Sequence, residues 1–348
     1  MGAGCSDANL LFKDAERLRA SKRFGHAITL YKKALRIYKG ADDIEGLLNC
    51  YLSIGDTMRA MGNFKSAMSH YEEGLNLADA IVDVEAMADA LVGMGLSLRA
   101  LGDWKRALLH IQRAERLYKR LVDKRGMAFS LWAKAGTYRL KGDIKRAIEL
   151  FHGALDAFTE LSDRSGIGYS YCGLGGCYRV SGRTTESERY YSMANDDFKR
   201  MRDTFGLAYS YCGLGNVQRM YGDYKKALSF FRKAEELYRR IGDRVSYAYT
   251  LWSMATTYKM IGDLNMAMRN FKKADRLFHI TDDPRGRIYC ILGYGELECL
   301  KGLDGKARAL FIKAREIAED YGFGIEMGYA ARLLKSLDDG KGIPVNLP

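Results

Sequence analysis

Proline is nearly absent from this sequence. It makes up 3 of 348 residues, about 1% where ~5% is usual, and so few helix breakers favour a helical chain. No stretch approaches the roughly 18 apolar residues that a membrane-spanning helix needs. No basic segment followed by an apolar run opens the sequence, so we expect no secretory signal.

Cysteine pairs with the spacing of metal or disulfide sites are also missing. The 7 cysteines are an odd number spread over a long chain, which favours a reduced, cytoplasmic compartment over a disulfide framework. The sequence contains no HExxH or GxSxG motif, no complete phosphate loop, and no nucleophile placed beside a base. We therefore expect a protein that is not an enzyme and that carries no metal or cofactor.

Positive charge, by contrast, is in excess. The 55 lysines and arginines outnumber the 43 aspartates and glutamates, which gives a net charge of +12 and a pI of about 9.2. Such a balance favours an anionic partner, which could be an acidic peptide, a nucleic acid or a lipid surface. The hydrophobic fraction of 47% indicates a chain that folds rather than one that stays disordered.

Glycine is abundant, and much of it recurs at a fixed spacing. Seven glycines lie 40 residues apart: Gly62, Gly102, Gly142, Gly182, Gly222, Gly262 and Gly302. Alanines and aspartates repeat with the same period, and a divergent copy precedes them near the N-terminus. The sequence therefore contains about eight units of a length typical of helical repeats that stack on their neighbours.

Each unit is predicted to form two helices joined by a tight turn. In the unit 203–242, Gly222 ends the first helix because glycine enters the left-handed conformation without strain. Asp223 is placed to cap the second helix by accepting a backbone hydrogen bond. Small residues on that helix let its neighbours approach closely, with an aromatic residue between them; these are Ala227, Phe231 and Ala234.

This pattern resembles the tetratricopeptide repeat. The residues that carry the resemblance are Leu214, Gly215, Asp223, Tyr224, Ala227, Phe231 and Ala234, and the pattern recurs over about residues 8–321. The usual unit has about 34 residues and ends in proline. Here the unit is longer and that proline is absent, which is similar to Leu-Gly-Asn repeat proteins, kinesin light chains and bacterial peptide-sensing regulators. The resemblance implies an all-α fold, a right-handed α-solenoid of about eight helix-turn-helix units.

Four segments follow from this reading. We expect an N-terminal segment over residues 1–7, the solenoid over 8–321, a capping helix over 322–337 and an extended tail over 338–348. A capping helix is needed because the last repeat otherwise leaves an apolar face open.

A ladder of cations marks the end of each predicted first helix. Its seven members occupy one position of the repeat: Arg19, Arg59, Arg99, Arg139, Arg179, Arg219 and Lys259. Arginine is preferred where a planar fork meets a carboxylate or phosphate, which favours a role in binding. The alternative is a structural ladder, because a cation near a helix C-terminus interacts favourably with the helix dipole.

Three further columns share this face of the first helices. The first is aromatic: Phe129, Tyr169, Tyr209, Tyr249 and Tyr289. The second contains Trp132, Cys172, Cys212 and Trp252, and the third is small or polar, with Gly136, Gly176, Asn216 and Thr256. The resemblance implies that these columns line a concave groove that grips a partner. The aromatic residues could equally pack against the neighbouring repeat.

The ladder is not uniform along the chain. We expect Asp56 to pair with Arg59 near the N-terminal end. In the last unit Cys299 replaces the cation, and Glu296 stands close by. The strongest stretch therefore lies in the fourth to sixth units. Lys134 occupies a position where other units have leucine or methionine, and nothing in the sequence explains that charge.

The leading functional hypothesis is a non-catalytic scaffold or adaptor whose groove binds an acidic segment of a protein. A nucleic-acid-binding solenoid is one alternative, but only weak, non-specific binding is expected because many lysines and arginines lie on the second helices. A regulatory peptide-sensing module that acts on an enzyme in trans is another. A membrane partner is expected only if Gly2 is myristoylated, which the motif at residues 1–6 would permit.

Overall fold

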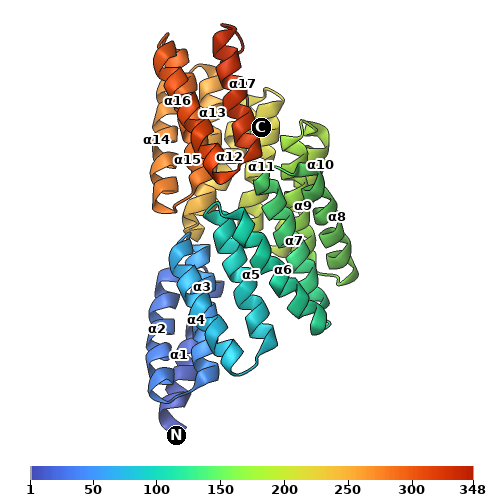
Figure 1. Cartoon of the computed structure of the whole chain (residues 1–348), viewed down its shortest axis with the longest axis vertical. Coiled ribbons are helices and arrows are strands. Elements are labelled where there is room, and N and C mark those ends of the chain that lie inside the picture. Colours follow the sequence, from blue (N-terminus) through green and yellow to red (C-terminus); the bar gives the residue numbers. More distant parts are fainter. Residues whose placement is uncertain (1, 348) are drawn as a thin grey trace. The chain divides into compact units, whose positions relative to one another are not determined.

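The computed structural model describes residues 2–347, and within them every regular element is an α-helix (Figure 1). The first helices of the units are α1 (Gly2–Ala20), α3 (Ile44–Ala60), α5 (Val84–Ala100), α7 (Lys124–Lys141), α9 (Arg164–Val180), α11 (Thr204–Met220), α13 (Arg244–Ile261) and α15 (Pro284–Cys299). The second helices are α2 (Phe24–Gly40), α4 (Phe64–Ala80), α6 (Trp104–Arg120), α8 (Ile144–Glu160), α10 (Thr184–Met201), α12 (Tyr224–Ile241), α14 (Leu264–Ile280) and α16 (Asp304–Tyr321). They are followed by α17 (Gly324–Asp338).

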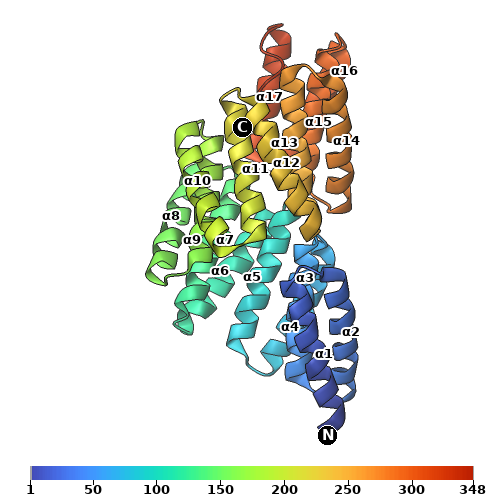
Figure 2. The same ribbon diagram turned by 180° about the vertical axis from the view of Figure 1, so that it is seen from behind.

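The eight helical hairpins and the capping helix confirm the predicted all-α solenoid. Successive helices pack on each other, and first helices also contact the first helix of the next unit, as in the row α9, α11, α13, α15 and α17 (Figure 2). Each repeat therefore places the same position of its first helix on one common face. None of the described helices combines the length and the apolar character needed to cross a bilayer.

The turns and caps follow the residues that predicted them. Gly222 has a φ of +83° at the end of α11, a conformation that glycine adopts at little cost. The Asp223 carboxylate accepts a hydrogen bond of 3.0 Å from the backbone N–H of Lys226 at the start of α12. This bond satisfies one of the free donors at the helix N-terminus.

The core of each hairpin is built from close helix contacts around an aromatic ring. Ala227, Phe231 and Ala234 are all fully buried. A Cβ added to Gly215 on α11 would lie 2.5 Å from the Phe231 ring. The Leu-Gly pair of the repeat therefore exists because the first helix needs a residue without a side chain where the aromatic ring of the second helix meets it.

A second set of turns joins one unit to the next, and glycine is used there less often. Gly242 and Gly322 have positive φ in this turn, but Val82 and Val122 occupy the same repeat position with φ of 59° and 56°. Both valines are about three-quarters exposed, at 75% and 74%. A β-branched residue is strained in this conformation, so these turns lower the stability of the chain.

Two compact units divide the chain: unit 1 comprises residues up to 134 together with 241–243, and unit 2 comprises residues 135–240 and those from 244 onward. The capping helix lies at Gly324–Asp338, close to the expected 322–337. The separate N-terminal segment differs from the expectation, because α1 already begins at Gly2. The myristoylation motif includes Met1, which lies outside the described residues.

Candidate partner-binding face

Each ladder cation reaches from its own first helix toward the first helix of the next unit. The Arg99 guanidinium lies 5.6 Å from the ring centre of Trp132, and the Arg219 guanidinium lies 5.9 Å from that of Trp252. A Cβ added to Gly176 would lie 2.4 Å from Nη1 of Arg139. The third column is small or polar because the cation of the preceding unit passes there, so the ladder and the columns interlock.

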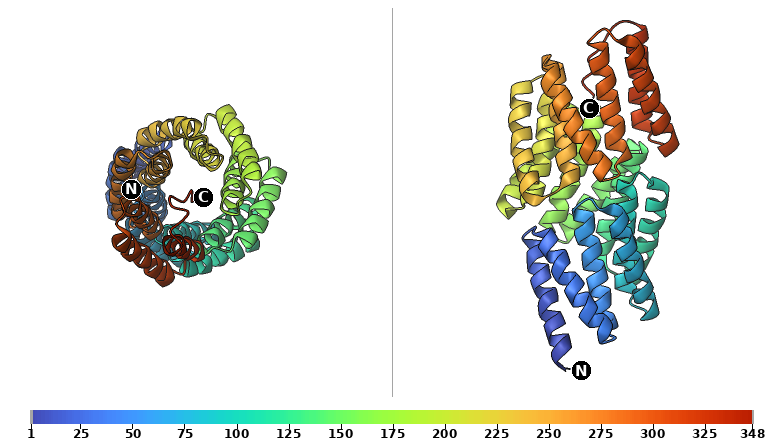
Figure 3. Two further views of the ribbon diagram at one scale, coloured as in Figure 1. Left: turned by 90° about the horizontal axis from the view of Figure 1, so that it is seen from above. Right: turned by 90° about the vertical axis from the view of Figure 1, so that its left-hand side faces the viewer.

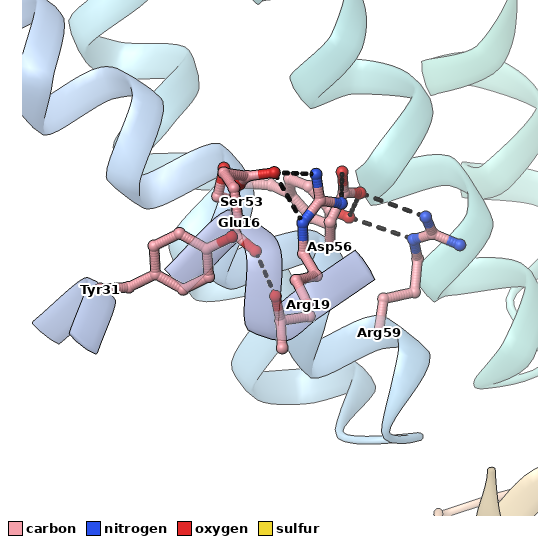
Figure 4. A network of polar contacts seen from close by, with 8 residues as sticks. Glu16, Arg19, Tyr31, Ser53, Asp56 and Arg59 are labelled. Carbon is pink, nitrogen blue, oxygen red and sulfur yellow. Dashed lines mark hydrogen bonds and ion pairs between the residues drawn. The ribbon is translucent and has the colours of Figure 1, made fainter. Parts of the chain in front are cut away.

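At the N-terminal end, in unit 1, the ladder is neutralised by carboxylates of the chain itself (Figure 4). Arg19 forms ion pairs with Glu16 at 2.6 Å and with Asp56 at 3.8 Å. Arg59 pairs with Asp56 at 3.1 Å, as the sequence predicted, and its Nε donates to the hydroxyl of Tyr71. Burial opposes ionisation of Glu16, but the hydrogen bond from Arg19 outweighs it and lowers the pKa of that carboxyl. These two rungs are therefore held within the structure.

The middle rungs, in unit 2, are different because cationic donors remain unmet. Nε and Nη1 of Arg179 and Nε of Arg219 are buried, and they have no hydrogen-bond partner within residues 2–347. Arg219 is fully buried. Burial and the neighbouring charge of Arg179 lower the pKa of Arg219 to about 9. This part of the face thus carries positive charge without enough negative charge around it.

Two polar residues accompany these arginines. The side-chain oxygen of Asn216 accepts a hydrogen bond of 3.0 Å from Nη2 of Arg219, and its amide nitrogen donates to the backbone carbonyl of Cys212. The hydroxyl of Tyr329 on α17 is buried without a partner among the described residues. Burial raises the pKa of this hydroxyl, opposed by Arg179, so near neutral pH it remains a donor. The arrangement therefore suits an acceptor that carries negative charge.

At the C-terminal end of the ladder, in unit 2, the charge is paired again. Nζ of Lys259 lies 2.5 Å from Oε2 of Glu296, and each side chain is only 1% exposed. Burial lowers the pKa of Lys259, and the carboxylate of Glu296 opposes that shift. The face therefore changes along the first helices from paired, to cation-rich, to paired.

The aromatic columns divide into two groups. Phe129 and Trp132 stack with ring centres 5.6 Å apart and remain half-buried. The half-buried Tyr169 donates a hydrogen bond of 2.8 Å to Asp203, and Tyr209 is also half-buried. These four side chains keep part of their surface available.

The remaining aromatic positions belong to the core of unit 2. Trp252 is 5% exposed and donates to the backbone carbonyl of Tyr289, which is itself 7% exposed. The ring of Tyr249 packs at 4.8 Å on that of Phe278, and the hydroxyl of Tyr289 donates to Glu326 of the capping helix. We had expected them to line the groove, but their rings instead support it, because α15 and α17 cover them.

Some residues that matter here were not singled out from the sequence. Lys134 forms an ion pair of 2.7 Å with Glu115 of α6, which accounts for a charge in an otherwise apolar column. Tyr329 lies in the capping helix, which has no other copy in the chain, so the repeat pattern could not mark it. Glu326 is fully buried there and pairs with Arg285 at 2.6 Å, which ties α17 to α15.

Comparison with solved structures shows the same fold. A Rap protein complexed with competence and sporulation factor is 15% identical, and the match covers 97% of this chain and 98% of that chain with a TM-score of 0.63. The Rap conjugation gene regulator of a plasmid, also in complex with a peptide, is 14% identical, with coverage of 98% and 99% and a TM-score of 0.67. A signal transduction ATPase with a tetratricopeptide repeat sensor from Pyrococcus horikoshii is 17% identical, with coverage of 97% and 50% and a TM-score of 0.54.

Comparison with sequences identifies the family. No curated protein matches the chain as a whole. The family model described as tetratricopeptide repeat matches residues 15–80, 86–160, 167–240 and 206–277, which together span most of the chain. The helical hairpins, the Gly-aromatic contacts and the capping aspartates agree with that match. The chain therefore belongs to the tetratricopeptide repeat family.

Proposed function

We propose that this protein is a non-catalytic adaptor whose ladder face binds an acidic segment of a partner protein. We use the name ladder face for the surface of α9, α11, α13 and α15 around Arg179, Arg219, Lys259 and Glu296. The observation that carries the proposal is the set of buried donors without partners on Arg179 and Arg219. A buried donor left unmet costs about 1–3 kcal/mol, and more when it is charged, so a site that retains several of them is suited to an anionic ligand.

The charge balance of unit 2 favours a carboxylate over a neutral ligand. Lys259 and Glu296 neutralise each other, while Arg179 and Arg219 repel. A carboxylate that accepted hydrogen bonds from both guanidinium groups would relieve this repulsion and use their unmet donors. Arginine is well suited to such two-pronged contacts, and the half-buried aromatic side chains beside it provide apolar contact area for an extended segment.

A regulatory peptide-sensing module is the second candidate. It is supported by the similarity over nearly the whole chain to two Rap proteins whose structures were determined with bound peptides. In that case the same face would bind a free peptide, and the response would be exerted on a further protein. Nucleic acid is expected to bind only weakly and with strong salt dependence, as for non-specific phosphate contacts.

The experiment that tests the proposal removes one unmet charge. Arg179→Met retains a long side chain but deletes the guanidinium. The matched control is Lys226→Met, which removes the same charge from an exposed site on α12. Binding is measured on an array of extended octapeptides of acidic, neutral and basic composition.

We expect the wild-type protein and the Lys226→Met variant to retain acidic octapeptides and the Arg179→Met variant to lose most of that binding. The Arg179→Met variant should at the same time be more stable, by about 1 kcal/mol, because a buried charge with unmet donors has been removed. Equal retention of neutral and acidic octapeptides, or equal loss in both variants, would show that the ladder face does not select acidic ligands.

A further inference from the structure

The segment that follows the capping helix returns onto the ladder face. After α17 ends at Asp338, the chain contains no further helix up to residue 347 and runs back past the helices of unit 2 (Figure 3). Val345 and Leu347 are 4% and 2% exposed. The segment 339–347, which we call the docked segment, is therefore extended as expected, but it is packed against the repeats rather than free in solvent.

The buried ion pair of the ladder face binds the backbone of this segment. The N–H of Val345 donates a hydrogen bond of 2.7 Å to Oε1 of Glu296. The carbonyl of the same residue accepts one of 3.0 Å from Nζ of Lys259. Both polar groups of one extended residue are thus satisfied by a single pair of charged side chains, and this mode of recognition does not depend on the side chain of the bound residue.

The next residue is recognised through its side chain. The oxygen of the Asn346 amide accepts a hydrogen bond from Nη1 of Arg219, and the amide nitrogen donates one of 2.8 Å to the backbone carbonyl of Arg219. Val345 and Leu347 bury apolar side chains on either side. The ladder face therefore holds an extended segment in which one polar residue lies between two apolar residues.

The repeat sequence departs from its own pattern at the point of contact. Lys259 is the one lysine of a ladder that otherwise consists of arginine. Glu296 stands in the column that contains Gly136, Gly176, Asn216 and Thr256. These two departures are the two side chains that bind the backbone of Val345. The contact is therefore built by substitutions specific to α13 and α15 and not by a general property of the repeat.

The docked segment leaves the cationic part of the face unsatisfied. Asn346 offers Arg219 a neutral amide, and the buried donors of Arg179 and Nε of Arg219 remain without a partner. An acidic segment could use the same backbone contacts at Lys259 and Glu296 and add a carboxylate beside the two arginines. Such a ligand would interact with more of the site than the docked segment does.

We infer that the docked segment is an internal occupant of the partner site, and that an acidic, extended segment of a partner protein displaces it. This inference rests on the proposed function, because it takes the ladder face as the partner site. The backbone contacts to Val345 and the amide of Asn346 hold the site closed in the free protein. Partner binding exchanges them for the same backbone contacts and a carboxylate.

The experiment uses the full chain. Hydrogen exchange of residues 341–347 is measured with and without a saturating acidic octapeptide, selected on the array. We expect these amides to be protected in the free protein and to exchange at least tenfold faster in the complex. Unchanged protection while the octapeptide is bound, as shown by fluorescence anisotropy, would overturn the inference.

Two full-length variants make the test quantitative. Asn346→Ala removes the contacts with Arg219 and should raise the affinity for the acidic octapeptide by about tenfold or more. Lys341→Ala changes an exposed residue of the same segment and should leave the affinity unchanged. If Asn346→Ala leaves the affinity unchanged or weakens it while the variant melts like the wild type, the segment is a structural strap and the inference fails.

A labelled peptide of residues 341–348, added to the Asn346→Ala variant, separates this inference from the proposed function. Binding of this peptide to the variant, together with weaker binding to the wild type, supports an internal occupant even if no acidic octapeptide binds. Acidic octapeptides that bind wild type and variant with equal affinity would support the proposed function and reject the occupant.

Discussion

The Lys259–Glu296 pair allows a quantitative test of how buried charge is tolerated in this fold. Glu296→Gln keeps the shape of the side chain but removes its charge. The Lys259 ammonium, which is 1% exposed and lies 2.5 Å from the carboxylate, would then retain the carbonyl of Val345 and lose its counter-charge. Removing one partner of a buried ion pair costs about 3–5 kcal/mol, and we expect a loss of this size.

The double variant Lys259→Met, Glu296→Met should behave differently. Replacing both charges by apolar groups of similar volume removes the desolvation cost along with the attraction, so the change is expected to lie between neutral and about 1–4 kcal/mol stabilising. The two single changes are therefore strongly non-additive. The double variant should nevertheless lose the backbone contacts to Val345, so residues 341–347 should exchange faster although α13 and α15 stay protected.

The assay is native-state hydrogen exchange of the α13 and α15 amides, supported by urea unfolding followed by circular dichroism at 222 nm. Exchange is preferred because repeat proteins open locally and a single unfolding transition need not report on one repeat. A cost below about 1 kcal/mol for Glu296→Gln, or a double variant as unstable as the sum of the two single variants, would refute the view that the pair is mutually dependent.

Three further predictions concern other parts of the chain. Val122→Gly should stabilise the protein by up to about 1 kcal/mol, since relief of left-handed strain exceeds the added entropy of the unfolded chain, and Gly242→Val should destabilise it in thermal melts. Burial raises the pKa of the Cys299 thiol to about 11; because the thiolate is the reactive form, alkylation at pH 8 should be about 100-fold slower than for a free thiol and should accelerate as the pH rises toward 11. Lys134→Leu should change stability by less than about 1 kcal/mol, because Glu115 keeps access to water and such partly exposed pairs contribute little; a larger loss in urea unfolding would show a stronger pair.

Much of the fold could be predicted because each unit solves the same packing problem in the same way. Gly222 and Asp223 mark a turn and a cap by local chemistry alone, and the structure contains both. The need for Gly215 beside Phe231 follows from the contact between two helices of one hairpin. Interactions within a repeat or between neighbouring repeats leave a periodic trace in the sequence, and the period of 40 residues is that trace.

The site was less predictable because its decisive contacts are not periodic. Asn346 contacts Arg219 across 127 positions of the chain, and no other copy of this pair exists in the sequence to reveal it. The charge state of the ladder also could not be read from the pattern: Arg59 meets Asp56, while Arg179 meets no counter-charge within residues 2–347. The sequence offered one signal that went unused, namely that Lys259 and Glu296 break their columns together.

The short connection between α17 and Val345 has a consequence for how tightly any partner binds. Only residues 339–344 join the end of the helix to the docked residues, and a short tether of this kind holds its end at an effective concentration of about millimolar. If the detached segment bound with a micromolar dissociation constant, its tethered form would weaken a competing ligand about 1,000-fold. A partner with nanomolar intrinsic affinity would then be measured as a micromolar one. Weak binding in solution would therefore be a property of the tether and not of the contacts that the partner makes.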